Sequence, residues 1–260
     1  MIEQEIETER SEPLVEMIGI SKSFGHVQAL KNVDFHVGYS EVVGLVGDNG
    51  AGKSTLIKIL MGIYHADKGE IYFEGRRVAF SSAAEARAAG IEAVYQDLGL
   101  VNTMNITRNF FLGKELVRYG RLGVLDRRQM DKTCLEYLTS LGIGIRSPNE
   151  AVLFLSGGER QAISIARSMY FGAKLLVLDE PTAALSIKEA QKVLDFIVDV
   201  KKRGLSVIFI THNIYHVYSV ADRFTILEKG INLGDVPRKD VTEEQIMRAI
   251  STGTPQWPTD

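Results

Sequence analysis

The chain has 260 residues, of which 45% are hydrophobic and 24% charged, and it carries 30 Lys and Arg against 33 Asp and Glu. This composition is typical of a globular protein and excludes a largely disordered or fibrous chain. The net charge of −3 lacks the basic excess of a dedicated nucleic-acid-binding protein, so we expect no nucleic-acid partner. Cys134 is the single cysteine, which excludes an intramolecular disulfide and indicates a reducing compartment. We expect it to be a small apolar residue within a helix.

Neither end of the sequence indicates a membrane or secretory segment. Residues 1–13 are acidic and end in Pro13, the opposite of a signal peptide, and predict a mobile tail. The longest apolar stretches, such as Leu175–Leu178, are far short of the ~20 residues that span a bilayer. At the other end, Pro255 and Pro258 flank Trp257, so we expect 251–260 to form an irregular, solvated tail. A soluble protein that reaches a membrane only through a partner is therefore predicted.

The first part of the chain predicts short strands that alternate with helices. A glycine-rich turn separates a strand at 41–46 from a helix at 53–61, and Gly90 is expected to end a later, alanine-rich helix. The other elements expected here are strands at 15–20, 33–37, 71–73, 78–80 and 91–95, and the helix at 83–89.

Between about 97 and 150 the strand signals vanish. Two segments suit helices, 106–112 and 126–141, and for the second of these Asp126 is a plausible N-cap and Gly142 a plausible stop. We interpret 97–150 as a helical insertion within one domain that covers 14–250.

The second part of the chain returns to alternating strands and helices. The apolar runs at 174–178 and 207–210 are typical of strands buried on both faces. Strands separated by helix-length crossovers predict an α/β fold with a mostly parallel sheet. The remaining expected elements are helices at 159–170 and 187–200, a short helix after 210, strands near 224–227 and 231–236, and a last helix from Thr242.

A phosphate-binding loop is the most informative motif. Residues 47–54 read Gly-Asp-Asn-Gly-Ala-Gly-Lys-Ser, a full match to G-x-x-x-x-G-K-[ST] between a predicted strand and helix. The glycines let successive backbone N–H groups converge on a phosphate, and the N-terminus of the helix adds partial positive charge. Lys53 would reach the β- and γ-phosphates, in binding and in catalysis, and Ser54 would ligate Mg²⁺. The predicted nucleotide-binding residues here are Gly47, Asp48, Asn49, Gly50, Ala51, Gly52, Lys53, Ser54 and Thr55.

Two acids follow the predicted strand at 174–178. Asp179 and Glu180 stand at its carboxyl end, where open α/β sheets bind their ligands. We expect Asp179 to hold Mg²⁺ through water and Glu180 to orient and deprotonate the attacking water. Such a pair alone would be solvated loop charge, but a phosphate loop in the same sheet favours catalysis.

A second anion-binding helix end is predicted at Ser156, where the glycines 157 and 158 free further backbone N–H groups. Two such ends far apart in one domain suggest that the second serves another subunit. The stretch Leu155-Ser-Gly-Gly-Glu-Arg-Gln161, together with the phosphate loop, resembles the ATP-binding cassette (ABC) family, whose signature is Leu-Ser-Gly-Gly-Gln. Here Glu159 replaces the usual Gln, while Ser156, Gly157 and Gly158 remain in place.

The resemblance implies roles for three further residues. Gln96 matches the position at which the family senses Mg²⁺ and the transmembrane partner, and His212 matches the switch histidine that contacts the γ-phosphate. Phe24 falls where the family places an aromatic that stacks on adenine, although a core aromatic is an alternative there.

One departure from the family lies after the catalytic Glu. The family commonly has Ser-Ala-Leu-Asp, whereas residues 183–186 read Ala-Ala-Leu-Ser. The Asp that usually helps communication between two nucleotide sites is thus absent, and Ser186 could instead cap the next helix. This departure leaves the strength of coupling between the two sites undecided, whereas the expectation of ATP binding is unaffected.

The segments 78–96 and 181–185 are similar to bacterial monosaccharide importers of the ribose and fructose class. That resemblance implies a P-loop NTPase cassette with a mostly parallel central sheet, an antiparallel N-terminal β subdomain and a helical insertion. It also implies an ATPase that uses ATP and Mg²⁺ as a head-to-tail homodimer. Its partners would be transmembrane permease subunits and, indirectly, a periplasmic sugar-binding protein. The protein would then sit as a peripheral protein on the cytoplasmic face of the inner membrane.

The permease is expected to dock around Gln96 and residues 97–112. Apolar side chains in this stretch fit either a partner groove or a small core of the insertion itself, and they are Leu98, Leu100, Val101, Phe110 and Phe111. Two other classes compete with the importer. A soluble cassette ATPase that acts on ribosomes or DNA would tend to carry two cassettes, a coiled-coil insert or basic extensions. An exporter cassette would have an export-type membrane partner.

Overall fold

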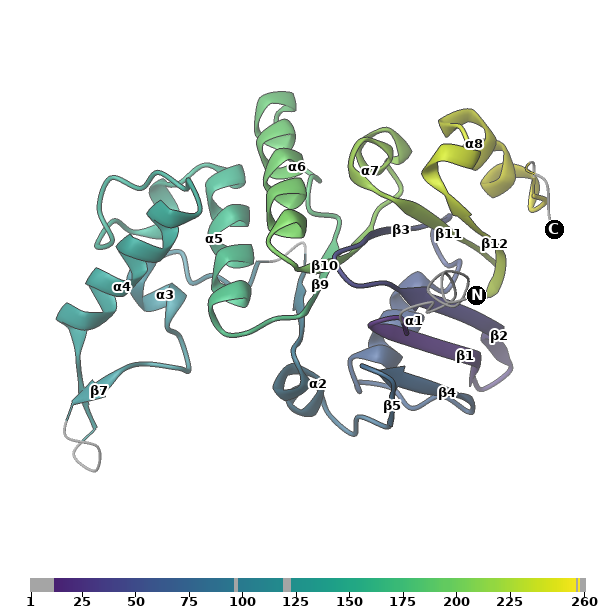
Figure 1. Cartoon of the computed structure of the whole chain (residues 1–260), viewed down its shortest axis with the longest axis horizontal. Coiled ribbons are helices and arrows are strands. Elements are labelled where there is room, and N and C mark those ends of the chain that lie inside the picture. Colours follow the sequence, from purple (N-terminus) through teal and green to yellow (C-terminus); the bar gives the residue numbers. More distant parts are fainter. Residues whose placement is uncertain (1–11, 96–97, 119–122, 256, 258–260) are drawn as a thin grey trace, which may run out of the picture.

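A six-stranded sheet runs through the middle of the molecule (Figure 1). The computed structural model describes residues 12–95, 98–118, 123–255 and 257. All neighbouring strands of this sheet are parallel except the last pair, in which β12 runs antiparallel to β11, so the predicted mostly parallel sheet is confirmed. Its strand order is β12 (Ile231–Pro237), β11 (Arg223–Glu228), β3 (Val42–Val46), β10 (Ser206–Ile210), β9 (Leu175–Asp179) and β6 (Ile91–Val94).

Helices cover both faces of this sheet, which explains the uninterrupted apolar runs of its strands. On one face, alternate strand residues such as Val43 and Val177 share a core with the helices α1 (Lys53–Leu60) and α2 (Ala83–Ala89). On the other face, residues such as Val207 pack against four helices, which lie above the sheet and to its left in Figure 1. These are α5 (Gly157–Tyr170), α6 (Ile187–Lys202), α7 (Ile214–Val220) and α8 (Glu243–Thr252), and a short 3₁₀ helix at Arg238–Asp240 precedes α8.

An antiparallel sheet packs beneath the central one, as the family resemblance implied (Figure 1). Its strands follow the order β2 (Val27–Val37), β1 (Val15–Phe24), β4 (Lys68–Phe73) and β5 (Arg76–Val78). β1 and β2 are longer than predicted. Bulges let their backbones stay paired through residues that lack an alternation of apolar and polar side chains. The strand predicted at 78–80 lies earlier in the structure, because β5 begins to pair with β4 directly after the tight turn between them and ends at Val78.

The segment between β6 and α5 holds the helices α3 (Ile106–Phe110) and α4 (Arg127–Ser140) and a 3₁₀ turn at Val152–Phe154. Phe110 and Phe111 are fully buried in a core between α3, α4 and α5, so these two belong to the core of this segment. Asp126 caps α4 as predicted and accepts a hydrogen bond from the backbone N–H of Gln129 at 3.1 Å. Cys134 is buried in the same core, where burial raises the pKa of its thiol to about 12, consistent with a small apolar residue.

The prediction that 97–150 contains no strands is wrong at one place. Two-residue strands, β7 (Val117–Arg118) and β8 (Val124–Leu125), pair in antiparallel fashion. Arg118 also forms an ion pair with Asp126 at 2.8 Å. Strands of two residues are too short to show an alternating pattern, which is why the sequence did not indicate them.

The expectation of a solvated C-terminal tail is wrong at Trp257. Its side chain is only 8% exposed and belongs to the core that also contains Val236 and Ile246. The indole lies directly on Gly234 of β12, where an added Cβ would come within 2.5 Å of the ring. An aromatic between two prolines gives no periodic signal, so only its tertiary contact reveals its place in the core.

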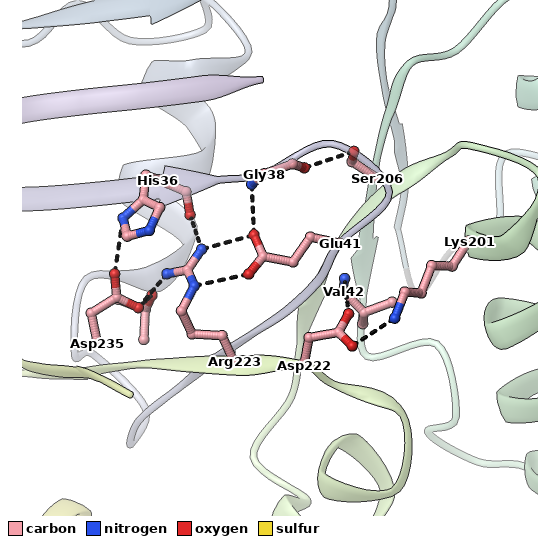
Figure 2. Close-up of polar contacts among 10 residues, drawn as sticks. His36, Gly38, Glu41, Val42, Lys201, Ser206, Asp222, Arg223 and Asp235 are labelled. Carbon is pink, nitrogen blue, oxygen red and sulfur yellow. Dashed lines mark hydrogen bonds and ion pairs between the residues drawn. The ribbon is translucent and has the colours of Figure 1, made fainter. Parts of the chain in front are cut away.

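Arg223 joins the two sheets through a network of buried ion pairs (Figure 2). Its guanidinium donates two hydrogen bonds to the carboxylate of Glu41, at 2.9 and 3.0 Å, and one to the carbonyl of His36 at 2.7 Å. It also pairs with Asp235 on β12, whose other carboxylate oxygen lies 2.9 Å from Nδ1 of His36. The side chain of Arg223 is 9% exposed, so these partners replace the water that the charge has lost.

Two acids near Arg223, Glu41 and Asp222, fix the backbone at the start of β3. Glu41 accepts a hydrogen bond from the backbone N–H of Gly38 at 2.6 Å and so orders the turn between β2 and β3. Next to Arg223, Asp222 accepts from the backbone N–H of Val42 at 2.8 Å and pairs with Lys201 at 2.6 Å (Figure 2). These contacts bind β2, β3, β11 and β12 together where β3 and β11 begin and where β2 and β12 end.

We predict that Arg223→Ala lowers the free energy of unfolding by about 3–5 kcal/mol, because it leaves Glu41 without a counter-charge and Asp235 with His36 alone. Urea unfolding followed by circular dichroism measures this loss. Exchange of the exposed Arg76 for Ala is the control and is expected to change the stability by less than about 0.5 kcal/mol. An equally small loss for Arg223→Ala would contradict the structural role of the network.

The same network predicts an acid limit of stability. Burial raises the pKa of Asp235, but the hydrogen bond from His36 and the charge of Arg223 outweigh it and hold that pKa below its ordinary value of 3.8. A lowered carboxylate pKa gives stability that is present above the ordinary pKa and lost as the pH falls through the folded one. This contribution therefore begins to decline as the pH falls below about 4, and urea unfolding at a series of pH values should show a smaller decline in Arg223→Ala than in the unchanged protein.

Candidate nucleotide site

The phosphate loop connects the end of β3 to the start of α1. Gly47, Gly50 and Gly52 have φ angles of 147°, 80° and 107°, a region that residues with a side chain rarely adopt. Neighbouring backbone also excludes a side chain at two of them. A Cβ on Gly47 would lie 2.1 Å from the carbonyl oxygen of Leu227, and one on Gly52 would lie 2.8 Å from that of Ala29.

Backbone hydrogen bonds fix this loop to the turn between β11 and β12. The N–H of Gly230 donates to the carbonyl of Ala51 at 3.0 Å, and the carbonyl of Gly230 accepts from the N–H of Lys31 at 2.7 Å. Ala51 is buried, whereas Asp48, Asn49, Gly50 and Ser54 are exposed and Thr55 is half-buried. The loop therefore has a rigid inner side and presents its outer residues to a ligand.

Lys53 is the first residue of α1 and lies under the loop. Its ammonium group donates to the carbonyls of Gly47 at 2.6 Å and Asp48 at 2.9 Å, and the residue is only 9% exposed. Burial lowers its pKa, while the negative charges of Glu180, Asp48 and Asp179 oppose that shift. A cation in this position, next to a helix N-terminus, suits a polyphosphate.

Asp179 ends β9 beside the phosphate loop. Burial is the largest cause of its raised pKa, and the charge of Glu180 adds to it, whereas Lys53 and Lys58 lower it. Burial disfavours the ionised form of Asp179. A divalent cation here would favour that form, because its positive charge stabilises the carboxylate.

Glu180 and His212 meet at the end of the neighbouring strand β10. One carboxylate oxygen of Glu180 accepts from the hydroxyl of Thr211 at 2.9 Å, and the other lies 3.0 Å from the backbone N and 2.6 Å from Nδ1 of His212. Glu180 has a φ of 52°, an uncommon conformation for a residue with a side chain, and its N–H donates to Ile210 at 2.9 Å. The structure thus brings these two predicted residues into direct contact.

Thr211 was missed by the sequence analysis, although its hydroxyl holds Glu180 directly. Its position after the strand 207–210, next to His212, could have indicated it. His216 was treated as an ordinary histidine, yet its Nδ1 lies 2.9 Å from the hydroxyl of Thr182, two residues after Glu180. Both contacts hold the segment that carries Glu180.

Ser156 caps α5, and the substitution at Glu159 has a local explanation. The N–H of Glu159 donates to the hydroxyl of Ser156 at 3.2 Å, and the N–H of Ser156 donates to the carboxylate of Glu159 at 2.8 Å. Glu and Gln serve equally well in such a reciprocal capping box. α5 and α1 pack on opposite faces of the central sheet, so the structure does not bring this helix end to the phosphate loop of the same chain.

Three other predicted positions complete the comparison. Ser186 caps α6, as the sequence suggested, with the N–H of Glu189 donating to its hydroxyl at 3.4 Å. Phe24 is 43% exposed at the end of β1, with its ring centroid 5.2 Å from that of Tyr64 and 5.5 Å from the ammonium of Lys22, so it is no core residue. Gln96 lies outside the described residues.

Comparison with known proteins decides the family. A sequence profile described as ABC transporter matches residues 30–183, more than half of the chain. The chain belongs to the ABC transporter family. Over 252 residues it is 43% identical to the fructose import ATP-binding protein FrcA of Rhizobium meliloti, a match that covers 95% of this chain and 96% of the relative. It is 44% identical to the xylose/arabinose import ATP-binding protein XylG of Sulfolobus acidocaldarius, with 92% and 94% of the chains covered.

Other relatives are about twice as long. The ribose import ATP-binding protein RbsA of Caldanaerobacter subterraneus is 37% identical, and the match covers 92% of this chain but 48% of that protein. Among solved structures, the ADP conformation of an ATP-binding cassette of an ABC transporter has a TM-score of 0.78 at 24% identity, with 92% and 95% of the chains covered. A dimeric post-hydrolysis cassette bound to ADP and Pi has a TM-score of 0.69 at 25% identity, covering 86% of this chain and 98% of that chain. These similarities confirm the fold class.

The part of the chain that the structure describes has no helix with the length and apolar character that crossing a membrane requires. Within the same residues, no group of three or more His, Cys, Asp and Glu side chains could hold a metal ion.

We predict that Lys53→Ala weakens nucleotide binding by roughly tenfold to a hundredfold, the effect expected when charge-assisted hydrogen bonds of about 1.5–3 kcal/mol are lost. Isothermal titration with ATP measures the change. Lys68→Ala, which alters an exposed lysine on β4, is the control and is expected to bind like the unchanged protein. Normal affinity in Lys53→Ala would contradict the assignment of the phosphate loop.

Proposed function

We propose that this chain is the ATP-hydrolysing subunit of an importer for a monosaccharide. The observation that carries the proposal is the hydrogen-bonded pair of Glu180 and His212 beside a phosphate loop that contains Lys53. The similarity of nearly the whole chain to import ATP-binding proteins for fructose and for xylose/arabinose supports the transported class.

The residues of the phosphate loop would hold the triphosphate. Backbone N–H groups of the loop bind phosphate oxygens, and Lys53 exchanges its contacts with loop carbonyls for contacts with the β- and γ-phosphates. The hydroxyl of Ser54 and the carboxylate of Asp179, with Gln96, would hold Mg²⁺, a donor set that suits a cation that keeps several waters. That ion supplies neutralising charge on the phosphates. Phe24 would stack on the adenine, for which its exposed ring is available.

Glu180 would act as the general base. Its carboxylate accepts hydrogen bonds from Thr211 and from the backbone of His212, which fix it in place. The side chain of His212 is 70% exposed, so its ring would be able to contact the γ-phosphate while Nδ1 remains hydrogen-bonded to Glu180. The geometry therefore favours in-line attack by a water that Glu180 orients and deprotonates.

A second subunit would complete each site. Because α5 and α1 lie on opposite faces of the sheet, the hydroxyl of Ser156 and the N–H groups of Gly157 and Gly158 would face the nucleotide of another copy. In a head-to-tail homodimer each copy would cover the ATP that is bound to Lys53 of its partner. Binding of ATP closes this dimer, and hydrolysis opens it again.

Transmembrane permease subunits would use this closure for transport, at the cytoplasmic face of the inner membrane. Between β6 and the helical segment lies a cavity of about 360 Å³, whose walls include Tyr95, Leu98 and Arg167. We expect a segment of the permease to dock there. A periplasmic sugar-binding protein would act only through the permease, so this chain need not contact the sugar.

We predict that Glu180→Gln retains ATP binding, lowers the hydrolysis rate by about 10²–10⁴-fold and accumulates an ATP-bound dimer. Phosphate release and light scattering measure the rate and the dimer. The control is Glu244→Gln, which changes an exposed carboxylate in the first turn of α8. An unchanged rate in Glu180→Gln would exclude Glu180 as the base.

The transport function is tested by purification of the tagged protein from membranes of its native cell in mild detergent. We expect a polytopic permease to co-purify, encoded beside a periplasmic sugar-binding protein. Recovery from the soluble fraction with ribosomes or nucleic acid would retain an ATPase and exclude the importer.

A further inference from the structure

The first turns of α5 and α6 pack directly against each other. A Cβ on Gly157 would lie 2.5 Å from Cδ2 of Leu185, and one on Gly158 would lie 3.4 Å from Cβ of Glu189. Neither glycine has a positive φ, so a strained backbone is not the reason for glycine here. At Gly157 the reason is close contact with Leu185, which places the segment that leads into α6 against the helix end that would receive a partner's nucleotide.

A carboxylate of the same chain faces this helix end. Glu189 is half-buried, and its Oε2 accepts hydrogen bonds from the hydroxyl of Ser186 at 2.7 Å and from the N–H of Ser186 at 3.1 Å. Its Oε1 would lie 3.9 Å from a Cβ on Gly157. The bonds from Ser186 lower the pKa of Glu189, and the backbone N–H groups of Gly158 and Gly157 contribute further, so the group is an anion at neutral pH.

The amides of Gly157 and Gly158 therefore already face a negative charge. In the proposed dimer they would bind the γ-phosphate of the partner's ATP, which carries negative charge of its own. Two anions at one helix end repel each other, so the phosphate either displaces the carboxylate of Glu189 or binds more weakly.

Ser186 links this carboxylate to the chain's own catalytic base. Five residues separate it from Glu180, and Glu180 and Ala184 both have positive φ angles, of 52° and 60°. The segment is therefore short and held in an uncommon backbone conformation, and it depends on its ends for its shape. Movement of Glu189 removes two hydrogen bonds from Ser186 at one of these ends.

We propose that Glu189 is a positioning residue that senses the γ-phosphate at Gly157 and Gly158 and, through Ser186, sets the position of the segment that carries Glu180. It would thereby couple the two nucleotide sites of a dimer in a chain with Ser186 where its family commonly has Asp. The inference rests on the proposed head-to-tail dimer.

The test compares Glu180→Gln with the double variant Glu180→Gln/Glu189→Gln. Gln retains the reciprocal cap of α6 but removes the charge, so unfolding should be unchanged. We expect half-maximal dimerisation, measured by light scattering against ATP concentration, at about fivefold lower ATP, the effect of one charge about 4 Å away across solvent.

A second measurement uses chains with Glu180 intact. In Glu189→Gln we expect the Hill coefficient of ATP hydrolysis to fall towards 1 and kcat to fall, whereas half-saturation moves to lower ATP. Ser186→Ala, which keeps the charge but removes the hydroxyl link, should lower the Hill coefficient without tightening the dimer.

The matched control is Glu85→Gln. Glu85 stands at the same position of α2 and is held by the N–H and hydroxyl of Ser81 at 2.8 and 2.6 Å, on the opposite face of the central sheet. It should change neither dimerisation nor the Hill coefficient.

Dimerisation of the double variant at the same ATP concentration as Glu180→Gln, with an unchanged Hill coefficient in Glu189→Gln, would overturn the role of Glu189 and leave the proposed function intact. Failure of Glu180→Gln itself to dimerise with ATP would overturn the dimer and this proposal together.

Discussion

The phosphate loop depends on one packing constraint, the close approach of its backbone to two other segments. Gly47 lies against the carbonyl of Leu227, and the carbonyl of Ala51 is bonded to the turn at Gly230, which in turn is bonded to β2. No side chain fits at Gly47 or Gly52, so the loop, the turn between β11 and β12 and the antiparallel sheet form one rigid unit. The buried Arg223 network fastens the same strands at their other end.

This rigidity matters because several charged groups lie partly buried and close together at the site. Lys53 and Asp179 lie close enough to each other and to the charge of Glu180 for these charges to affect the pKa of Lys53 and of Asp179, with Lys53 buried and Asp179 partly so. Charges in such a place have lost much of their hydration and need fixed partners. The carbonyls of the loop hold the ammonium, and Thr211 and His212 hold the carboxylate of Glu180, so each group is placed before a nucleotide arrives.

Two reciprocal caps, at Ser156 and Ser186, likewise fix the N-terminal ends of α5 and α6 before a ligand binds. Each Ser-x-x-Glu pair satisfies backbone N–H groups that a helix leaves free, and each also brings a carboxylate to the region that would meet a second subunit. Helix stability and the electrostatics of the proposed dimer are therefore set by the same residues.

The sequence by itself determined the parallel sheet, the phosphate loop and the identity of the residues around it, because these depend on local spacing and on apolar runs that only a doubly covered strand explains. Only the tertiary structure decided the rest. The contact of Thr211 with Glu180, the buried place of Trp257 on Gly234 and the approach of Glu189 to Gly157 and Gly158 join residues without any shared local pattern. They arise when helices and strands distant in the chain pack together, and packing of that kind leaves no periodic trace in the order of amino acids.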